Sequence, residues 1–528
     1  MYSWLQAMFQ SAPAALLFLA SLGAPSALSA RDGIYGEPTP ITPTRLRAHL
    51  EFVADDLMEG RDTPSRGLDT TALYISTQLK LWGVKPGGDN GSYFQFINLG
   101  SAVADAEKTT MKLAGQDLKF GEDFVAQGST GQANGKMVFV GQGWMIKEKG
   151  IDPYKGVDVK GKLLLVAGGQ PTGFRRIMRA GKEGVDFLSP ESAVKLYGAK
   201  GIVRVASDVD LAGWDRLSGK TPPRASGPSA KVADVPLVIV KPEAMQKALT
   251  SQANAIIANN SPTPPSAAID ADVSYNVVMK PVAVRTENVV AIIPGSDPTL
   301  KAEYVAFGAH MDHVGMGGNG PDKIFNGADD DGSGTVSILE ICHAFATGPK
   351  PKRSMLFVWH CGEEKGLWGS SYFTNNPTVP IDKIVAQLNI DMIGRSRKPG
   401  DTNAANKMLT GPNEIYVVGS KRMSDDLYNA SVAANNDLYK LQYNYHYDEP
   451  NDPESIFTRS DHYNYAVKGI PIIFWFDGVH EDYHRPGDEV SKIDFEKMAK
   501  VARTVYGLGF RLGNDANRPK VLRSATGG

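Results

Sequence analysis

The chain has 528 residues, of which 42% are hydrophobic and 22% are charged, a balance typical of a globular protein with more than one domain. Its 56 Lys and Arg residues are offset by 58 Asp and Glu residues. This near-neutral balance excludes the strongly basic surface of a nucleic-acid-binding protein, so we expect no nucleic-acid partner.

The N-terminus contains a short apolar run, Ala14–Leu22, which small residues follow as far as Ala30. The run is too short to span a bilayer comfortably and is typical of a signal peptide. No Lys or Arg precedes it, so an uncleaved anchor and a misassigned start are the alternatives. We therefore predict that residues 1–30 are a signal peptide, that the protein is exported (periplasmic or secreted), and that the mature chain has no membrane span.

Residues 31–124 are predicted to form the N-terminal part of the main domain, with two helices. The first begins near Thr44 and the second ends at Gly83, which is well placed to stop it. The apolar residues that recur near helical spacing in the first are Leu46, Leu50, Phe52, Val53 and Leu57.

Residues 125–268 have a different texture, dominated by short β-like runs, and are predicted to form an inserted β-rich domain. The strand candidates are Lys136–Val140, Lys162–Val166, Gly201–Val205 and Val235–Val240.

Residues 269–528 return to an alternation of β and α patterns. This alternation predicts an α/β fold with a mostly parallel central sheet flanked by helices. The strand candidates are Val289–Ile293, Tyr304–Ala309, Met355–Trp359, Ala386–Met392, Ile415–Val418 and Ile470–Phe476, and the helix candidates between them include Thr335–Thr347 and Leu367–Thr374.

Residues of metal-binding type follow these strands. In such sheets ligands bind beyond the carboxyl ends of the strands, so the segments found there bear on function. Successive strand ends and loops offer His, Asp, Glu, Asp and His, which are ligand types for Zn²⁺ or a similar dication. Two ions that share one carboxylate would use this set. The segments are His310-Met311-Asp312, Asn326–Gly334, Gly362–Gly366, Asn389–Met392 and Asp482–Pro486.

These five segments, taken in order, resemble the M28 family of zinc peptidases. Ser460-Asp461-His462 and Gly469-Ile470-Pro471 also match its C-terminal part, and Glu59-Gly60-Arg61 matches more weakly. The insert resembles a protease-associated (PA) domain, notably in Asp158–Leu163 and Gly198–Gly201.

The resemblance implies a role for each residue at the site. His310 and Asp391 would bind one Zn²⁺, Glu364 and His484 the other, and Asp330 would bridge them. Glu363 corresponds to the general base, and Asp312 to a carboxylate that orients His310. Tyr483 matches a tyrosine that stabilises the oxyanion in some members.

The chemistry of such a site is coherent in its own right. Two dications can activate a water molecule, since a Zn²⁺-bound water can have a pKa of about 7. Glu363 would accept the proton as the water attacks the scissile carbonyl and would deliver it to the leaving amine. Other divalent cations could replace zinc.

Simpler interpretations exist for several of these residues. Asp329, Asp330 and Asp331 could be a polar turn before a helix, and the choice of Asp330 among them rests on the motif. The Glu363-Glu364 pair could be an acidic helix start. His480 competes with His484 for the ligand role. We expect His462 and Asp461 to shape the pocket or the surrounding fold.

The function that we predict is an exported aminopeptidase acting on peptide substrates, with this specificity resting on the family resemblance. Arg395, Arg459 and Arg485 are alternatives for binding a substrate carboxylate, which would indicate a carboxypeptidase, although we expect a structural role for each. Another amide hydrolase and a non-catalytic, receptor-like binding protein are further alternatives. Cys342 and Cys361 are expected to be buried free thiols, and the oligomeric state stays open.

Overall fold

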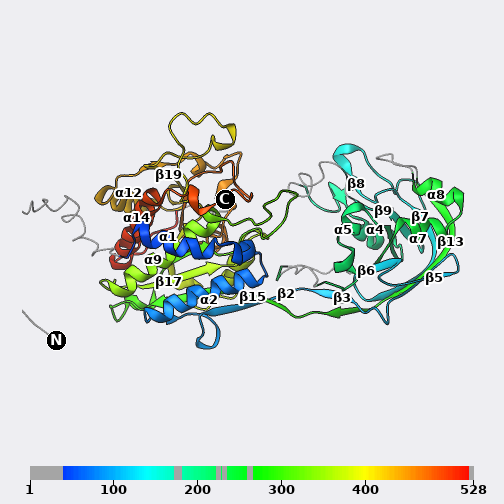
Figure 1. The fold of residues 1–528 in the computed structure, drawn as a ribbon, viewed down its shortest axis with the longest axis horizontal. Helices are drawn as coiled ribbons and strands as arrows, with labels where there is room; N and C mark the ends of the chain where they lie inside the picture. The colour runs from blue at the N-terminus through cyan, green and yellow to red at the C-terminus, as the bar shows by residue number, and fades with distance from the viewer. Residues whose placement is uncertain are drawn as a thin grey trace, which may run out of the picture.

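The structure is a computed structural model that describes residues 40–169, 171, 181–221, 227–228, 235–258 and 266–522. The predicted signal peptide lies outside the described residues. Figure 1 shows two lobes that are joined by extended segments. The larger lobe is built on a nine-stranded sheet and the smaller one on an eight-stranded sheet.

Four parallel strands form the centre of the larger sheet, in the order β17 (Ser354–His360), β16 (Tyr304–His310), β18 (Ile384–Ile390) and β21 (Ile472–Phe476). On either side, β15 (Val284–Ile293) runs antiparallel to β17 and β19 (Glu414–Val418) antiparallel to β21. The outer strands are β1 (Lys85–Pro86), β2 (Phe94–Leu99) and β20 (Gln442–Asn444). The predicted α/β sheet is therefore confirmed. Its centre is parallel, antiparallel pairs lie on either side, and the edge pair of β19 and β20 is again parallel.

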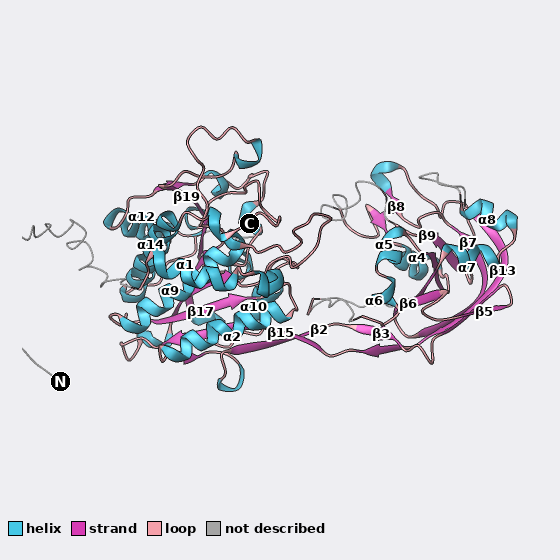
Figure 2. Ribbon diagram, viewed as in Figure 1, coloured by secondary structure: helices cyan, strands magenta, loops and turns pink. Residues whose placement is uncertain are grey.

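Helices cover both faces of this sheet (Figure 2). Every residue of β17 is buried, as expected for a strand with both faces covered. One face packs against α1 (Pro43–Val53), α2 (Arg66–Leu81), α9 (Gly334–Thr347), α12 (Asp425–Asp437) and α14 (Phe495–Asn514). The opposite face packs against α10 (Trp368–Asn375), α11 (Ser420–Met423) and α13 (His462–Val467).

The two N-terminal helices end where local chemistry stops them. The predicted stop at Gly83 is confirmed: Gly83 has φ +67°, and the next amide, Val84 N, donates to Leu79 O at 3.0 Å. The first helix is shorter than its apolar pattern suggested. Since α1 ends at Val53, Leu57 lies outside it and is 82% exposed, whereas Phe52 lies within the helix and is 37% exposed.

The smaller lobe is wider than the expected range of 125–268. Its sheet has the order β5-β4-β13-β7-β9-β11-β12-β6, and β13 (Ala267–Val277) continues past residue 268 to pair with β4 (Thr110–Leu113). A separate ladder, β3 (Ala102–Ala104) with β14 (Met279–Pro281), lies between this sheet and the larger lobe in sequence. The other strands are β5 (Gln116–Leu118), β6 (Phe124–Gly128), β7 (Gly131–Phe139), β9 (Leu163–Ala167), β11 (Gly201–Val205) and β12 (Pro236–Val240).

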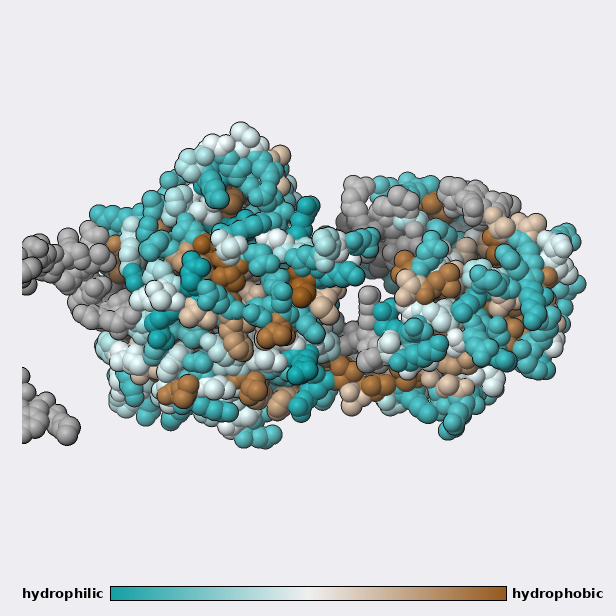
Figure 3. All heavy atoms as spheres, in the orientation of Figure 1, coloured by the Kyte–Doolittle hydropathy of each residue, from teal (hydrophilic) through white to brown (hydrophobic). Residues whose placement is uncertain are grey.

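Three further features concern the surface, the helices and the cysteines. On the face drawn in Figure 3, hydrophobic residues occur in small groups among hydrophilic ones. No helix within the described ranges combines the length and the apolar character that crossing a membrane requires. Cys342 and Cys361 are both buried and free, as expected, and burial raises the pKa of both thiols.

Candidate metal centre

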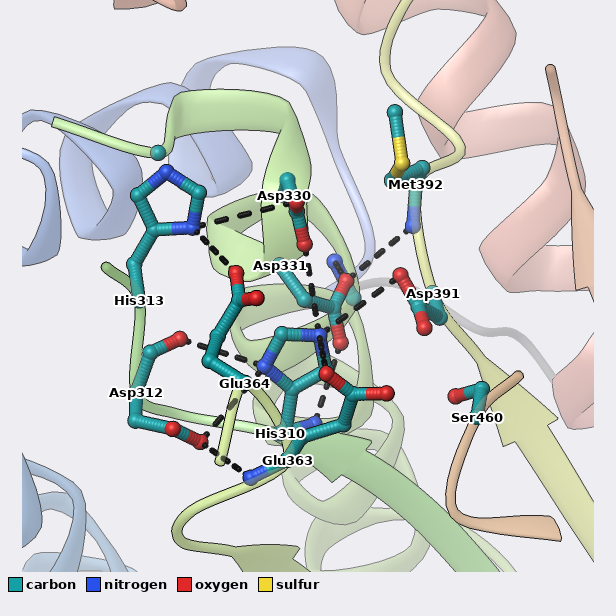
Figure 4. A network of polar contacts seen from close by, with 12 residues as sticks. His310, Asp312, His313, Asp330, Asp331, Glu363, Glu364, Asp391, Met392 and Ser460 are labelled. Carbon is teal, nitrogen blue, oxygen red and sulfur yellow. Dashed lines mark hydrogen bonds and ion pairs between the residues drawn. The ribbon is translucent and has the colours of Figure 1, made fainter. Parts of the chain in front are cut away.

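The five predicted ligands come together at the carboxyl end of the parallel strands. Figure 4 shows four of them, His310, Asp330, Glu364 and Asp391. His310 is the last residue of β16, and Asp391 directly follows β18. Glu364 lies four residues beyond the end of β17, and Asp330 lies in the turn before α9. His484 comes from the loop that follows β21. The side chains therefore converge because parallel strands end at the same edge of the sheet.

One group of ligand atoms surrounds the His310 ring. Its Nε2 lies 3.3 Å from Asp330 Oδ1 and 3.7 Å from Asp391 Oδ1. The Glu363 carboxylate lies just outside this group, with Oε2 4.0 Å from the same nitrogen. His310, Asp330 and Asp391 thus form one candidate metal site, and Glu363 stands beside it.

A second group uses the other oxygen of Asp330. His484 Nε2 lies 3.1 Å from Asp330 Oδ2 and 3.0 Å from Glu364 Oε2. Asp330 thus presents Oδ1 to one histidine and Oδ2 to another, which is the arrangement that a carboxylate shared by two ions requires.

His313 belongs to this second group and was not singled out from the sequence. It is fully buried, and its Nδ1 lies 2.9 Å from Glu364 Oε1 and 3.8 Å from Asp330 Oδ2. The available signal was its place in the His310–His313 segment that leaves a central strand. Its position suits either a further ligand or a donor that fixes the Glu364 carboxylate.

The side chains fit a pair of dications. Several buried atoms have no hydrogen-bond partner among the described residues, although oppositely polarised atoms lie close to them. These atoms are His310 Nε2, His313 Nδ1, Asp330 Oδ2, Glu364 Oε1 and His484 Nε2. Nitrogen and carboxylate oxygen at this density form a donor set for Zn²⁺ and related ions.

The electrostatics of the group agree with this fit. Burial lowers the pKa of His484, but the adjacent carboxylates of Asp330 and Glu364 outweigh this effect and raise the pKa to about 10. For Glu363, burial is the largest influence and raises its pKa well above the ordinary value. The His484 shift reflects an excess of buried negative charge, and the charges of Asp391 and Glu364 add to the Glu363 shift. Bound dications would neutralise this charge.

Asp312 connects two parts of the site. Its Oδ1 lies 3.6 Å from His310 Nδ1 and accepts a hydrogen bond from Glu363 N at 3.1 Å. The His310 Nδ1 is also 3.1 Å from the Asp312 backbone oxygen. Asp312 therefore lies where the resemblance put it, beside His310, and it also holds the segment that carries Glu363.

The two neighbours of Asp330 belong to neither ligand group and instead accept hydrogen bonds from backbone amides. Asp329 Oδ1 accepts from Gly394 N at 2.7 Å. Asp331 accepts from Gly334 N at 2.9 Å and from His310 N at 3.1 Å. Asp329 and Asp331 thus fix the loop, while the Asp330 carboxylate faces the histidines.

Asp488 holds the backbone of this loop by hydrogen bonds, a role that the sequence did not reveal. One of its oxygens, Oδ2, accepts hydrogen bonds from Asp329 N at 3.0 Å and Asp330 N at 3.1 Å. Its other oxygen lies 3.6 Å from Arg395 NH1, and Arg395 also pairs with Asp482 at 2.9 Å. The buried Arg395 is therefore structural, as expected.

Arg61 fastens the two ligand-bearing segments to the N-terminal helices. It is 1% exposed and donates to four backbone carbonyls. The acceptors are Met311 O at 3.0 Å, Val53 O at 2.6 Å, Asn326 O at 2.6 Å and Gly327 O at 2.9 Å. One guanidinium thus holds both the His310 segment and the loop that leads to Asp330.

His480, the competitor of His484, lies outside both groups of ligands. It is buried, and its Nε2 is 3.3 Å from Asp329 Oδ2. His462 and Asp461 are also buried: His462 Nε2 lies 2.9 Å from Phe457 O, and Asp461 Oδ2 lies 3.3 Å from His360 Nδ1. All three support the surroundings of the site.

A pocket opens beside the ligands, and Tyr483 lies in its wall. The acidic residues that line the pocket are Asp330, Glu363 and Asp391. The Tyr483 ring stacks on His484 with centroids 3.9 Å apart, and its hydroxyl accepts from Arg459 NH2 at 3.4 Å. Burial raises the pKa of Tyr483, so the hydroxyl keeps its proton at neutral pH and can donate it in a hydrogen bond. The apolar walls of the pocket are Met392, Ile456, Phe474, Phe476 and Val479.

Known proteins resemble this part of the chain. Residues 288–508 match the sequence model of peptidase family M28. The probable leucine aminopeptidase of Arthroderma benhamiae is 29% identical over 231 residues, 42% of this chain and 56% of that protein. Leucine aminopeptidase 2 of Trichophyton rubrum is 26% identical over 277 residues, 47% of this chain and 50% of that protein. The chain thus spans about half the length of these relatives.

Two solved structures align with most of the chain. An aminopeptidase from Aneurinibacillus sp. has a TM-score of 0.48 at 17% identity, covering 92% of this chain and 96% of that one. The zinc aminopeptidase of Bacillus subtilis has a TM-score of 0.49 at 16% identity, covering 89% and 95%. The match to the model of peptidase family M28 spans residues 288–508, a range that includes every predicted ligand.

Proposed function

We propose that the chain is an exported peptidase that binds two zinc ions and removes N-terminal residues from peptides. The observation that carries the proposal is the position of Asp330, whose Oδ1 lies 3.3 Å from His310 and whose Oδ2 lies 3.1 Å from His484. A carboxylate that presents both oxygens in this way is suited to bridging two ions.

The residues that would hold the ions divide into two groups. His310 and Asp391 would bind one ion, Glu364 and His484 the other, and Asp330 both. Bound at these groups, two dications polarise a substrate carbonyl and lower the pKa of a water molecule.

Glu363 is suited to move a proton in this reaction. Its carboxylate stands beside the ligands, 4.0 Å from His310 Nε2, and burial raises its pKa. We propose that an oxygen of Glu363 accepts the proton of the attacking water and passes it to the nitrogen of the departing amine. The hydrogen bond from Glu363 N to Asp312 Oδ1 holds the backbone that carries this base.

Tyr483 is suited to stabilise the negative charge that develops on the carbonyl oxygen. Its hydroxyl accepts from Arg459, so its own hydrogen is free to point toward the substrate. Its ring packs on His484, which limits the directions that the hydroxyl can take. The apolar pocket next to it would receive a substrate side chain and exclude water from the reacting bond.

The choice of an aminopeptidase follows the names of the relatives, several of which are leucine aminopeptidases. A carboxypeptidase would use the same ions and the same base but would need a cation for the terminal carboxylate of the substrate. Export follows from the apolar run at Ala14–Leu22.

A panel of short peptides tests the proposal. Peptides with free or acetylated N-termini and with free or amidated C-termini are given to the purified chain with zinc, with a chelator, and as the Glu363→Ala variant. We expect zinc-dependent release of N-terminal residues that acetylation and the variant both abolish. Cleavage that does not depend on acetylation but requires a free C-terminus would contradict the aminopeptidase assignment. Absence of cleavage by the folded, zinc-loaded protein would contradict the peptidase assignment.

A further inference from the structure

One arginine at the substrate pocket has no structural task. Of the three candidates, Arg395 is buried between Asp482 and Asp488, and Arg485 is exposed and lies outside the pocket lining. Arg459 lines the pocket, and it forms no ion pair with any residue that the structure describes. Its guanidinium is therefore available to a ligand that enters the pocket.

The backbone under Arg459 is firmly anchored. Ile456 and Phe457 are 2% exposed, and Ser460 is 1% exposed. Arg459 N donates to Ile456 O at 3.1 Å, and Asn389 Nδ2, from a central strand, donates to Ser460 Oγ at 3.1 Å. A charged side chain on an anchored backbone is preorganised for binding, because little backbone entropy is lost when a ligand binds.

Among the described residues, the guanidinium has one hydrogen-bond partner, which leaves most of its donors unused. NH2 donates to the Tyr483 hydroxyl at 3.4 Å, which is long for a hydrogen bond. A guanidinium has five N–H donors in a planar fork that matches a carboxylate. The donors that do not contact Tyr483 can therefore face the pocket or solvent. The carboxylates of Asp330 and Asp391 across the pocket are the ones that the ions would engage.

We propose that Arg459 binds a carboxylate of the substrate, and this inference rests on the proposed function. The carboxylate can belong to the side chain that enters the apolar pocket or to the C-terminus of a short peptide. The pocket favours the side chain: a glutamate would lay its methylene groups on Ile456 and Phe476 and direct its charge toward Arg459. The chain is then a peptidase with a preference for an anionic group beside the scissile bond.

The test compares matched substrates that differ in one charge. Glu-Ala-amide against Gln-Ala-amide probes the side chain, and Leu-Ala against Leu-Ala-amide probes the C-terminus. The variant is Arg459→Gln, and Arg485→Gln removes the same charge one residue from His484 but outside the pocket lining. We expect Arg459→Gln to lower kcat/KM for the carboxylate-bearing member of one pair about tenfold more than for its neutral partner, beyond any loss that both members share through the Tyr483 hydroxyl. Arg485→Gln should leave both preferences unchanged.

Two results would overturn the inference. If Arg459→Gln slows all four peptides by one factor, Arg459 acts through Tyr483, and if it slows none, Arg459 has no role. Calorimetric binding of the same four peptides to the zinc-loaded Glu363→Gln variant, with and without Arg459→Gln, supplies a second readout. If no peptide is hydrolysed by the unmodified chain, the proposed function fails, while loss of binding confined to a carboxylate-bearing peptide would still support Arg459 as its binding residue.

Discussion

Arg61 offers the sharpest test of how the fold positions the candidate site. Replacing it with alanine removes donors from four buried carbonyls, on Val53, Met311, Asn326 and Gly327. Each such hydrogen bond contributes a net ~1 kcal/mol, so the free energy of unfolding should fall by about 4 kcal/mol. Burial lowers the pKa of Arg61, because a charge in the protein interior loses its hydration. Removing the charge removes this desolvation free energy, which offsets part of the loss of stability. We therefore treat about 4 kcal/mol as the upper end of the expected loss.

The assay is urea unfolding of the metal-free chain, in which zinc cannot mask the change. Arg61→Lys is the matched control: it keeps the charge, but a single ammonium cannot donate along the directions of all four bonds, so an intermediate loss is expected. Arg61→Ala should also weaken zinc binding, because Met311 adjoins His310 and Gly327 leads to Asp330. A loss of stability below about 1 kcal/mol for Arg61→Ala would refute the reasoning.

Three further predictions concern the site and its support. Glu363→Gln should lower kcat about 10²- to 10⁴-fold while the chain still binds zinc, measured by peptide hydrolysis and metal analysis; unchanged kcat would remove Glu363 as the base. His313→Ala should weaken zinc binding about 10- to 100-fold in a chelator competition, and unaltered affinity would leave His313 as a packing residue. Glu340 is fully buried between Arg45 (2.8 Å) and His49 (2.7 Å); burial tends to raise its pKa, but hydrogen bonds from His343, His49 and Arg45 lower it. Because the pKa of Glu340 is lower in the folded state, its contribution to stability is present above the unfolded pKa of about 4.3 and is lost as the pH falls. Glu340→Gln should therefore lower the free energy of unfolding by about 2 kcal/mol at pH 7 and by progressively less at acid pH. A difference in unfolding free energy that does not change with pH would contradict this.

The parts of the fold that follow from local pattern could be predicted from the sequence. Apolar residues dominate the central strands, and β11 and the start of β16 lie where the pattern predicted them. The stop at Gly83 follows from its left-handed backbone conformation. The convergence of the five ligands could also be predicted, since it needs only the order of the strands and the rule that ligands collect at their carboxyl ends.

The parts that depend on distant contacts could not be predicted. Asp488 is separated from Asp330 by 158 residues, yet it fixes that residue's amide, and Arg61 is separated from Asn326 by 265 residues. The limits of the smaller lobe were misjudged because β13 pairs with β4 across the whole insert. His313 was overlooked because a lone histidine beside a motif looks the same in sequence whether it faces the site or the core.

The central claim is that two ions share the Asp330 carboxylate, and counting them tests it most directly. Zinc bound per chain after equilibration and removal of free metal should be two, and Asp391→Asn and Glu364→Gln should each reduce it to one by removing a ligand of a different ion. One zinc in the unmodified chain, or loss of the same ion in both variants, would contradict the shared carboxylate and the dinuclear site built on it.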